Sequence, residues 1–183
     1  MAQTYTKLLY HIVFSTKNRE PMIDPVWRDE LHAYMGGIIR NRKGDLLRAG
    51  GIPDHMHLLV RLAASRSVSD VVRDVKCNSS LWLHDRGFAA FDWQNGYGAF
   101  TLGFESIPVV AHYIDHQVDH HHSETFQTEF VDMLVKNGIE RNTSGNEVSP
   151  RSRPRASAWG SSRRLLRSEE VWLFSSPRSG RLL

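Results

Sequence analysis

The chain has 183 residues, of which 40% are hydrophobic and 23% charged, and its formal net charge is +3. This length and composition are typical of one globular domain with a proper core. No apolar run approaches the roughly 20 residues that span a bilayer, and we expect no secretory signal, because the N-terminus lacks a basic start and an apolar block. The single cysteine, Cys77, excludes an intramolecular disulfide and is typical of a reducing cytoplasm.

The positive charge lies in the last part of the chain. Residues 149–183 hold 8 arginines and 2 glutamates, whereas the first 148 residues hold 15 Lys and Arg against 18 Asp and Glu. A nucleic-acid-binding surface on the body therefore requires local clustering of basic side chains, which the net charge does not reveal.

The first predicted elements are a strand and a helix. Residues 5–16, YTKLLYHIVFST, are rich in aromatic and β-branched side chains and predict a central strand. A helix is predicted over residues 24–42, with Asp24 as its N-cap and a proline at the first helical position. Two glycines inside this helix, Gly36 and Gly37, indicate close packing against another element.

The stretch DLLRAGGIPDHMHLLVRL, residues 45–62, predicts two strands, with Gly50, Gly51 and Pro53 marking the connection. Because strand side chains alternate between the two faces, His55 and His57 lie on one face and the intervening apolar residues point into the core. Two imidazoles side by side at the start of a strand can hold a metal, or they are polar residues at an edge.

A second helix is predicted from Ser67 to Gly87, and a strand pair over residues 91–104 with its turn at Asn95-Gly96. Two helices follow, over residues 106–122 and 123–138. The order strand, helix, strand, strand, helix, strand predicts an α+β, ferredoxin-like fold, in which an antiparallel sheet carries helices on one face and C-terminal helices are added. The Ser/Arg/Pro-rich residues 143–183 lack periodicity and predict a flexible extension.

The helix predicted over residues 106–122 contains five of the ten histidines. Tyr113 and Gln117 are four residues apart and therefore lie on one helical face. A separate stripe of His112, His116 and His120 could bind a metal by itself. The alternative is a solvated polar face, with the tyrosine half-buried against the sheet.

Five blocks of the sequence occur in an order and at a spacing that resemble the HUH-endonuclease tyrosine transposases, the insertion-sequence and REP-associated group. The blocks are HIVFSTKNREP, GGIPDHMHLLVRL, VSDVVRDVKCNSSLWLH, WQNGYGAF and VAHYIDHQVDHH. An HxH pair alone is weak evidence, but HxH followed by YxxxQ on a late helix is specific. The resemblance covers residues 5 to about 140, so residues 1–142 are expected to form the catalytic domain.

The resemblance implies that Tyr113 is the nucleophile and that His55, His57 and Gln117 hold one divalent metal, Mg²⁺ or Mn²⁺. Two imidazoles and one amide oxygen leave coordination positions open for a phosphate oxygen and water, which suits phosphoryl transfer. A tyrosine hydroxyl ordinarily has a pKa near 10, so a metal or a basic group must favour the phenolate.

Other residues receive supporting roles. Asp54 could orient the imidazole of His55 or simply cap the start of the strand. His121, with its neighbours His120 and His122, is an alternative metal ligand that ranks below Gln117. Tyr97 could stack on bases, whereas a core position is favoured for Phe100. The candidate DNA-binding residues are Lys17, Arg19, Arg61, Lys76 and Tyr97.

The implied product is a 5′-phosphotyrosine with a free 3′-OH, which conserves the phosphodiester energy for rejoining. No nucleotide cofactor is then needed, and no GxxxxGK[ST] loop occurs in the sequence. We therefore expect a metal-dependent transposase that nicks and joins single-stranded or hairpin DNA, in DNA transposition or in the processing of REP elements.

Two other classes stay open: a domesticated hairpin-DNA-binding protein that no longer cleaves, and an RNA-binding module. The resemblance further implies a homodimer that acts without a membrane, in a prokaryotic cytoplasm and associated with the nucleoid.

Overall fold

The structure is a computed structural model that describes residue 3, residues 5–121 and residues 125–139. Two compact units divide between residues 124 and 125. The first unit contains a four-stranded sheet with the helices α1–α4, and α5 is the described helix of the second unit. Across the described residues, no helix is both long and apolar enough to cross a membrane.

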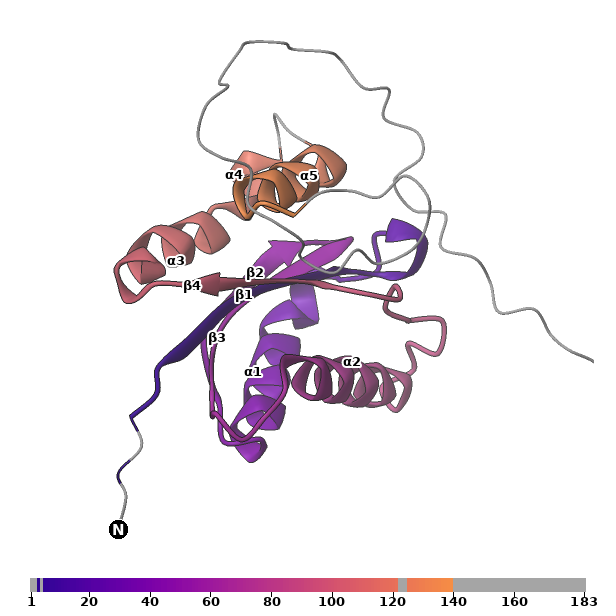
Figure 1. The fold of residues 1–183 in the computed structure, drawn as a ribbon. Coiled ribbons are helices and arrows are strands. Elements are labelled where there is room, and N and C mark those ends of the chain that lie inside the picture. The colour runs from indigo at the N-terminus through magenta and orange to yellow at the C-terminus, as the bar shows by residue number, and fades with distance from the viewer. Residues whose placement is uncertain (1–2, 4, 122–124, 140–183) are drawn as a thin grey trace, which may run out of the picture. The chain divides into compact units, whose positions relative to one another are not determined.

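The sheet of the first unit is antiparallel throughout (Figure 1). Its strands are β1 (Leu8–Ser15), β2 (Asp45–Ile52), β3 (His55–Leu62) and β4 (Gly98–Leu102), in the spatial order β2-β3-β1-β4. This order confirms the predicted α+β, ferredoxin-like fold. The two buried strands, β1 and β3, lie at the centre, and β2 and β4 form the edges.

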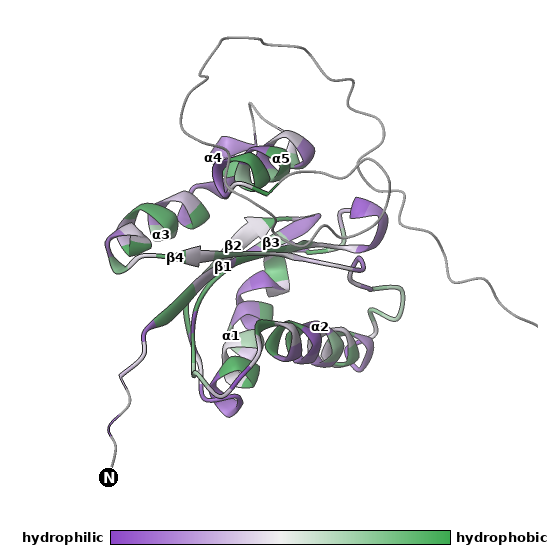
Figure 2. Ribbon diagram, in the orientation of Figure 1, coloured by the Kyte–Doolittle hydropathy of each residue, from purple (hydrophilic) through white to green (hydrophobic). Residues whose placement is uncertain are grey.

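The main core lies between the sheet and two helices, α1 (Pro25–Asn41) and α2 (Val68–His84), which cover one face (Figure 1). The first helix begins at the predicted cap, Asp24, which accepts a hydrogen bond from the Val26 amide. Ser67 and Ser69 were both possible caps for the second helix, and Ser67 is the cap, because it accepts a hydrogen bond from the Asp70 amide. Figure 2 shows β1 and β3 mostly in the hydrophobic colour. The strands contribute Ile12, Phe14, Met56, Leu58, Val60 and Leu62 to this core.

The opposite face of the sheet carries α3 (Ile107–Asp115), which follows η2 (Phe104–Ser106) and is followed by α4 (Gln117–His120) (Figure 1). The prediction of one continuous helix over residues 106–122 was wrong, because the chain leaves helical geometry at His116, with φ −106° and ψ 22°. The His116 ring bonds through Nδ1 to the His112 carbonyl, at 2.8 Å. The same carbonyl also accepts the regular helical hydrogen bond from the His116 amide, at 3.2 Å, so the bond from the ring accompanies the break and replaces no helical bond.

The prediction of a strand pair over residues 91–104 was also wrong. Only β4 is formed there, together with an isolated bridge between Thr16 and Trp93. Lys76 on α2 donates hydrogen bonds to the carbonyls of Gln94 and Gly96. A side chain thus binds these two loop carbonyls. Gly96 adopts a φ of 83°, which glycine reaches at little cost.

Three remaining expectations have separate outcomes. A Cβ at Gly36 would lie 3.5 Å from Leu46 of β2, which is close packing as predicted, but a Cβ at Gly37 would meet no atom within 4 Å. The predicted last helix is α5 (Phe126–Lys136), capped by Thr125 and followed by Gly138 at a φ of 68°. The predicted boundary at residue 142 and the extension that follows it lie outside the described residues.

Candidate active site

His55 and His57 begin β3 on the sheet face that α3 covers. In the pairing with β1, His57 lies opposite Val13 and His55 lies opposite Ser15. Both histidines therefore lie on a central strand of the sheet. Both side chains have 0% exposure. Buried polar rings require hydrogen-bond partners, and the partners determine which ring nitrogen carries the proton.

The partner of His55 is the neighbouring Asp54. Nδ1 of His55 lies 2.8 Å from Oδ1 of Asp54, and Arg19 donates to the other carboxylate oxygen at 2.9 Å. Burial opposes ionisation of Asp54, yet the hydrogen bonds from His55 and Arg19 hold the pKa of this carboxyl below its usual value. The carboxylate thus fixes the proton of His55 on Nδ1 and directs Nε2 toward α4.

The partner of His57 comes from β1. Nδ1 of His57 lies 2.9 Å from Nε2 of His11, and the two rings stack with centroids 5.1 Å apart. With Nδ1 of both HxH rings engaged, each ring would bind a metal through Nε2. This is the usual arrangement of metal-binding histidines, whose other nitrogen donates to a supporting group.

Gln117, at the start of α4, and His121, directly after its end, extend the site. Oε1 of Gln117 lies 3.3 Å from Nε2 of His55, and Nε2 of His121 lies 3.1 Å from the same atom. Gln117 is 1% exposed. Of the ligands expected around His55, the structure thus brings both the preferred Gln117 and the alternative His121 into contact with it.

These distances fit a small divalent cation. Ligand atoms that are each about 2.1 Å from one ion in octahedral geometry lie about 3 Å from one another. The spacing of Gln117 Oε1 and His121 Nε2 from His55 Nε2 is close to that value. Imidazole nitrogens and an amide oxygen are both ligands that divalent cations use in proteins.

Tyr113, on α3, lies against the same histidines in the same chain. Its ring centroid is 5.8 Å from that of His57, 6.1 Å from that of His11 and 5.3 Å from that of His120. The close approach of α3 to β2 depends on Gly50, where a Cβ would lie 2.5 Å from the carbonyl oxygen of Ile114. A glycine in the edge strand therefore lets the tyrosine helix reach the HxH pair.

The histidine stripe of α3 does not form a separate cluster. The rings of His112 and His116 are exposed neighbours with centroids 4.0 Å apart. His120, beyond the helix break, instead contacts Tyr113 and His121 through its ring. The break at His116 separates the stripe into an exposed pair and one residue of the site.

Two of the candidate DNA contacts are exposed ion pairs. Lys17 pairs with Asp92 at 3.0 Å, beyond the end of β1. Arg61 pairs with Asp45 across β2 and β3, with Nε 2.8 Å from the carboxylate. Exposed pairs of this kind stabilise a fold by about 1 kcal/mol or less, so both basic groups can exchange their partners for phosphates at low cost.

Of the three remaining candidates, Arg19 is partly buried and held by its ion pair with Asp54, at 2.9 Å. Lys76 and Tyr97 differ in access. Lys76 is held by two backbone carbonyls of the 94–96 loop, and burial lowers the pKa of its amine to about 8. Tyr97 is 40% exposed, and burial of its hydroxyl raises the pKa of this tyrosine. Phe100 is 4% exposed, in agreement with the predicted core position. Tyr97 is thus the aromatic side chain of this segment that can reach a base.

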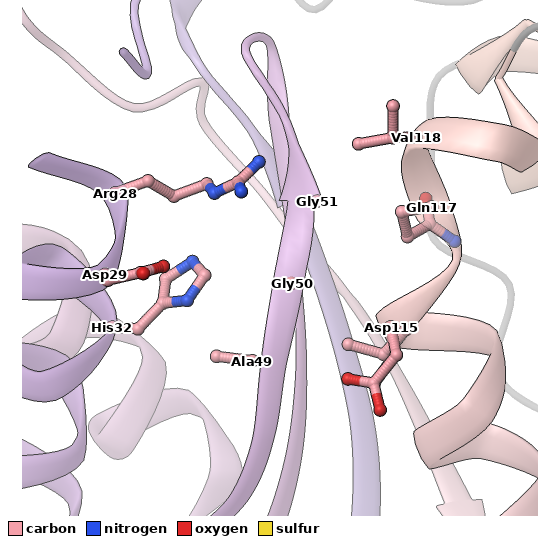
Figure 3. A pocket seen from close by; sticks show the side chains of 10 residues that line it. Arg28, Asp29, His32, Ala49, Gly50, Gly51, Asp115, Gln117 and Val118 are labelled. Carbon is pink, nitrogen blue, oxygen red and sulfur yellow. The ribbon is translucent and has the colours of Figure 1, made fainter. Parts of the chain in front are cut away.

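A pocket of about 190 Å³ lies along the edge of β2, beside the site. Figure 3 shows Arg28 and His32 of α1 on one side of the strand and Asp115, Gln117 and Val118 on the other. The backbone of Gly50 and Gly51 lies between them (Figure 3). Gln117 therefore lines both the candidate site and this pocket at the edge of the sheet.

His11 is the site residue that sequence reasoning missed. It stands in an apolar strand as a lone polar residue, and it is 6% exposed. Alternation along β1 places His11 on the face of Val13 and hence of His57. A histidine within an apolar strand can be noticed in the sequence. Its contact with His57 depends on the register between β1 and β3, which the sequence does not specify.

Comparisons with known proteins identify relatives of the chain. The family model described as "Transposase IS200 like" matches residues 4–117. The transposase for insertion sequence element IS200 of Salmonella typhimurium is 29% identical over 130 residues, which cover 65% of this chain and 82% of that protein. The corresponding transposase of Salmonella typhi matches with the same identity and the same coverage.

Two solved structures resemble the fold. A candidate transposase from Deinococcus radiodurans R1 has a TM-score of 0.50 at 22% identity, covering 64% of this chain and 96% of its own. A REP-associated tyrosine transposase bound to a REP hairpin has a TM-score of 0.51 at 17% identity, covering 83% of this chain and 94% of its own. At 22% and 17% identity, these two matches show a similar fold and nothing more.

Proposed function

The chain belongs to the IS200-like transposase family, and from this premise we propose that it cleaves and rejoins single-stranded DNA through a covalent bond to Tyr113. The observation that carries the proposal is the position of the Tyr113 ring, 5.8 Å from the His57 ring within one chain. A hydrolytic nuclease uses an activated water as its nucleophile, whereas this site places a phenol beside the proposed metal-binding histidines.

The divalent metal would be held by Nε2 of His55, Nε2 of His57 and Oε1 of Gln117, and His121 offers a further ring nitrogen beside His55. When bound, Mg²⁺ or Mn²⁺ supplies positive charge that neutralises the scissile phosphate. Asp54 keeps His55 in the tautomer that such binding requires.

The chain's own residues perform the transfer as follows. The Tyr113 hydroxyl loses its proton, and its oxygen forms a bond to phosphorus while the bond from phosphorus to the 3′-oxygen breaks. The proton passes through solvent to the 3′-oxygen, which leaves as the 3′-OH of the 5′ fragment, and the 3′ fragment stays on the tyrosine through its 5′-phosphate, as a phosphodiester. A 3′-OH of a second strand reverses these steps and rejoins the DNA.

The substrate that we propose is single-stranded DNA with a hairpin. One support is the solved neighbour that binds a REP hairpin. A second is the pair of exposed basic groups, Lys17 and Arg61, whose partners are solvent-exposed carboxylates. Tyr97 adds an exposed ring for stacking on an unpaired base.

Covalent capture of DNA tests the proposal. The full chain is incubated with Mn²⁺ or Mg²⁺ and a pool of 3′-labelled hairpin oligonucleotides, because a 5′-phosphotyrosine retains the 3′ fragment. We expect a labelled protein band that survives denaturation, is lost in Tyr113→Phe and persists in Tyr34→Phe. Tyr34 is a matched control, because it stacks on Trp82 on the other face of the sheet.

Other outcomes favour the other classes. Tight binding of the hairpins without an adduct would indicate a DNA-binding protein that no longer cleaves, and a preference for the same sequences as RNA would indicate an RNA-binding module. An adduct that persists in Tyr113→Phe would contradict the proposed nucleophile.

Three further properties belong to the proposal. The enzyme is expected to need no nucleotide cofactor, since the covalent intermediate conserves the bond energy. It is expected to act on DNA in a prokaryotic nucleoid. It is also expected to form a homodimer, which light scattering on the purified chain would measure, although Tyr113 and the HxH pair already meet within one chain.

A further inference from the structure

His11 is a buried histidine to which the proposed chemistry assigns no role. It is 6% exposed, and the residues directly opposite it in the sheet, Leu59 of β3 and Phe100 of β4, are apolar. Burial of an imidazole among such residues is costly without a specific partner. Retention of a histidine here therefore indicates a contact that an apolar residue would not make.

The contacts of His11 join the metal site to the nucleophile. Nε2 of His11 lies 2.9 Å from Nδ1 of His57, and the two rings are stacked at 28°. The ring of Tyr113 meets His11 edge-on, with centroids 6.1 Å apart and an interplanar angle of 82°, and it also lies 5.8 Å from the ring of His57. Among the described residues, His11 thus contacts both a proposed ligand and the proposed nucleophile.

A hydrogen bond between two ring nitrogens needs one N–H group and one lone pair. A histidine that binds a metal through Nε2 must be neutral and must carry its proton on Nδ1. The proton shared by His57 and His11 therefore belongs to Nδ1 of His57, and Nε2 of His11 accepts it. We propose that His11 is a positioning residue that fixes the tautomer and ring orientation of His57 for metal binding beside Tyr113.

The use of an imidazole has a physical reason at this position. His55 has an ionised carboxylate, Asp54, as its partner, and that carboxylate is already balanced by Arg19. His11 instead contacts the ring of Tyr113, which has to approach a phosphate. A neutral acceptor there holds His57 without placing a negative charge that would repel the phosphate.

This inference rests on the proposed function for its consequence, but its test does not depend on cleavage. The histidines of the full chain are labelled with ¹⁵N, and the tautomer of His57 is measured by long-range ¹H–¹⁵N NMR without metal. We expect the proton on Nδ1 in the wild type. His11→Leu should lose this preference, and His11→Gln, whose amide oxygen can accept the same hydrogen bond, should restore it.

Binding of Mn²⁺ to the same proteins, followed by electron paramagnetic resonance, gives the second measurement. His11→Leu should weaken the affinity about 10- to 100-fold, the usual effect of removing a partner of a metal-binding histidine. His11→Gln should return it to within a few-fold of the wild type. His32→Leu, which removes a half-buried imidazole from α1, should leave the affinity unchanged.

The outcomes separate the two proposals. Wild-type tautomer and affinity in a folded His11→Leu would overturn the role of His11, as would a His11→Gln variant that behaves like His11→Leu. If His11→Leu does not fold, His11→Asn replaces it, because the shorter amide falls short of His57. A wild type that shows the expected tautomer and Mn²⁺ affinity but forms no DNA adduct would refute the proposed function and leave the role of His11 standing.

Discussion

The imidazole of His32 lies in the pocket at the edge of β2 (Figure 3). Its Nε2 atom is buried and has no hydrogen-bond partner among the described residues. Burial lowers the pKa of His32 to about 4, the positive charge of Arg28 lowers it further, and Asp29 opposes this effect only in part. The folded chain therefore keeps His32 neutral at pH values where the unfolded chain protonates it.

This difference predicts that stability falls as the pH is lowered. Below about pH 6.5 the unfolded state binds a proton at His32 that the folded state does not, so the free energy of unfolding decreases until both states are protonated below about pH 4. The contribution is at most about 3 kcal/mol. In His32→Gln, denaturant unfolding between pH 7 and about pH 4 should show a smaller loss of stability than in the wild type. An equal loss in both proteins would show that the folded state protonates His32 normally.

At the scale of elements, the site depends on how closely α3 approaches β2. A Cβ at Gly50 would lie 2.5 Å from the Ile114 carbonyl oxygen and 2.8 Å from its side chain, and neither the backbone nor the buried isoleucine can yield without moving α3. Gly50→Ala is therefore expected to displace Tyr113 and to lower the rate of adduct formation more than tenfold, with a destabilisation of about 1–3 kcal/mol.

Gly37→Ala is the matched control for this prediction. A Cβ at Gly37 meets no atom within 4 Å, and the residue lies inside α1, so alanine should stabilise the helix by about 0.5–1 kcal/mol and leave adduct formation unchanged. Thermal unfolding and the labelled-hairpin assay measure both effects. Full activity of Gly50→Ala would show that α3 can shift without moving the nucleophile.

The sequence predicted the parts of this architecture that depend on local patterns. Alternation along β3 correctly placed His55 and His57 on one face, and the caps at Asp24 and Ser67 correctly placed two helix starts. Features that involve hydrogen bonds from side chains to backbone carbonyls could not be predicted from such patterns. The helix break at His116 coincides with a hydrogen bond from its ring to the His112 carbonyl, and Lys76 binds the carbonyls of the loop where a strand was predicted.

The candidate site divides in the same way. The ligand and nucleophile positions follow from a resemblance that rests on spacing, and the structure brings Tyr113, His55, His57 and Gln117 together. The hydrogen bond between His11 and His57 joins residues that are 46 positions apart in the chain, and it depends on the register between β1 and β3. Long-range pairing of this kind has no local signature, because one strand's pattern is compatible with several registers.

At the scale of the whole molecule, charge is divided unevenly along the chain. The first 148 residues carry a small excess of acidic groups, whereas residues 149–183 carry eight arginines and two glutamates. Each phosphate that a basic group neutralises makes the slope of log affinity against log salt steeper by about 0.7 for single-stranded DNA. If the terminal arginines contact DNA, they should dominate the part of the affinity that does not depend on sequence.

Two triple variants of the full chain test this division. Changing Arg151, Arg153 and Arg155 to glutamine should lower the slope of log affinity against log salt by about 2, in a titration of fluorescent hairpin DNA. The same change at Arg40, Arg66 and Arg73, which are exposed around α1 and α2 on the face of the sheet away from the HxH pair, should leave the slope unchanged. Since both variants lose three positive charges, a purely global effect of net charge would lower both slopes equally. That result would assign the electrostatic attraction to the field of the whole molecule and not to contacts made by its C-terminal arginines.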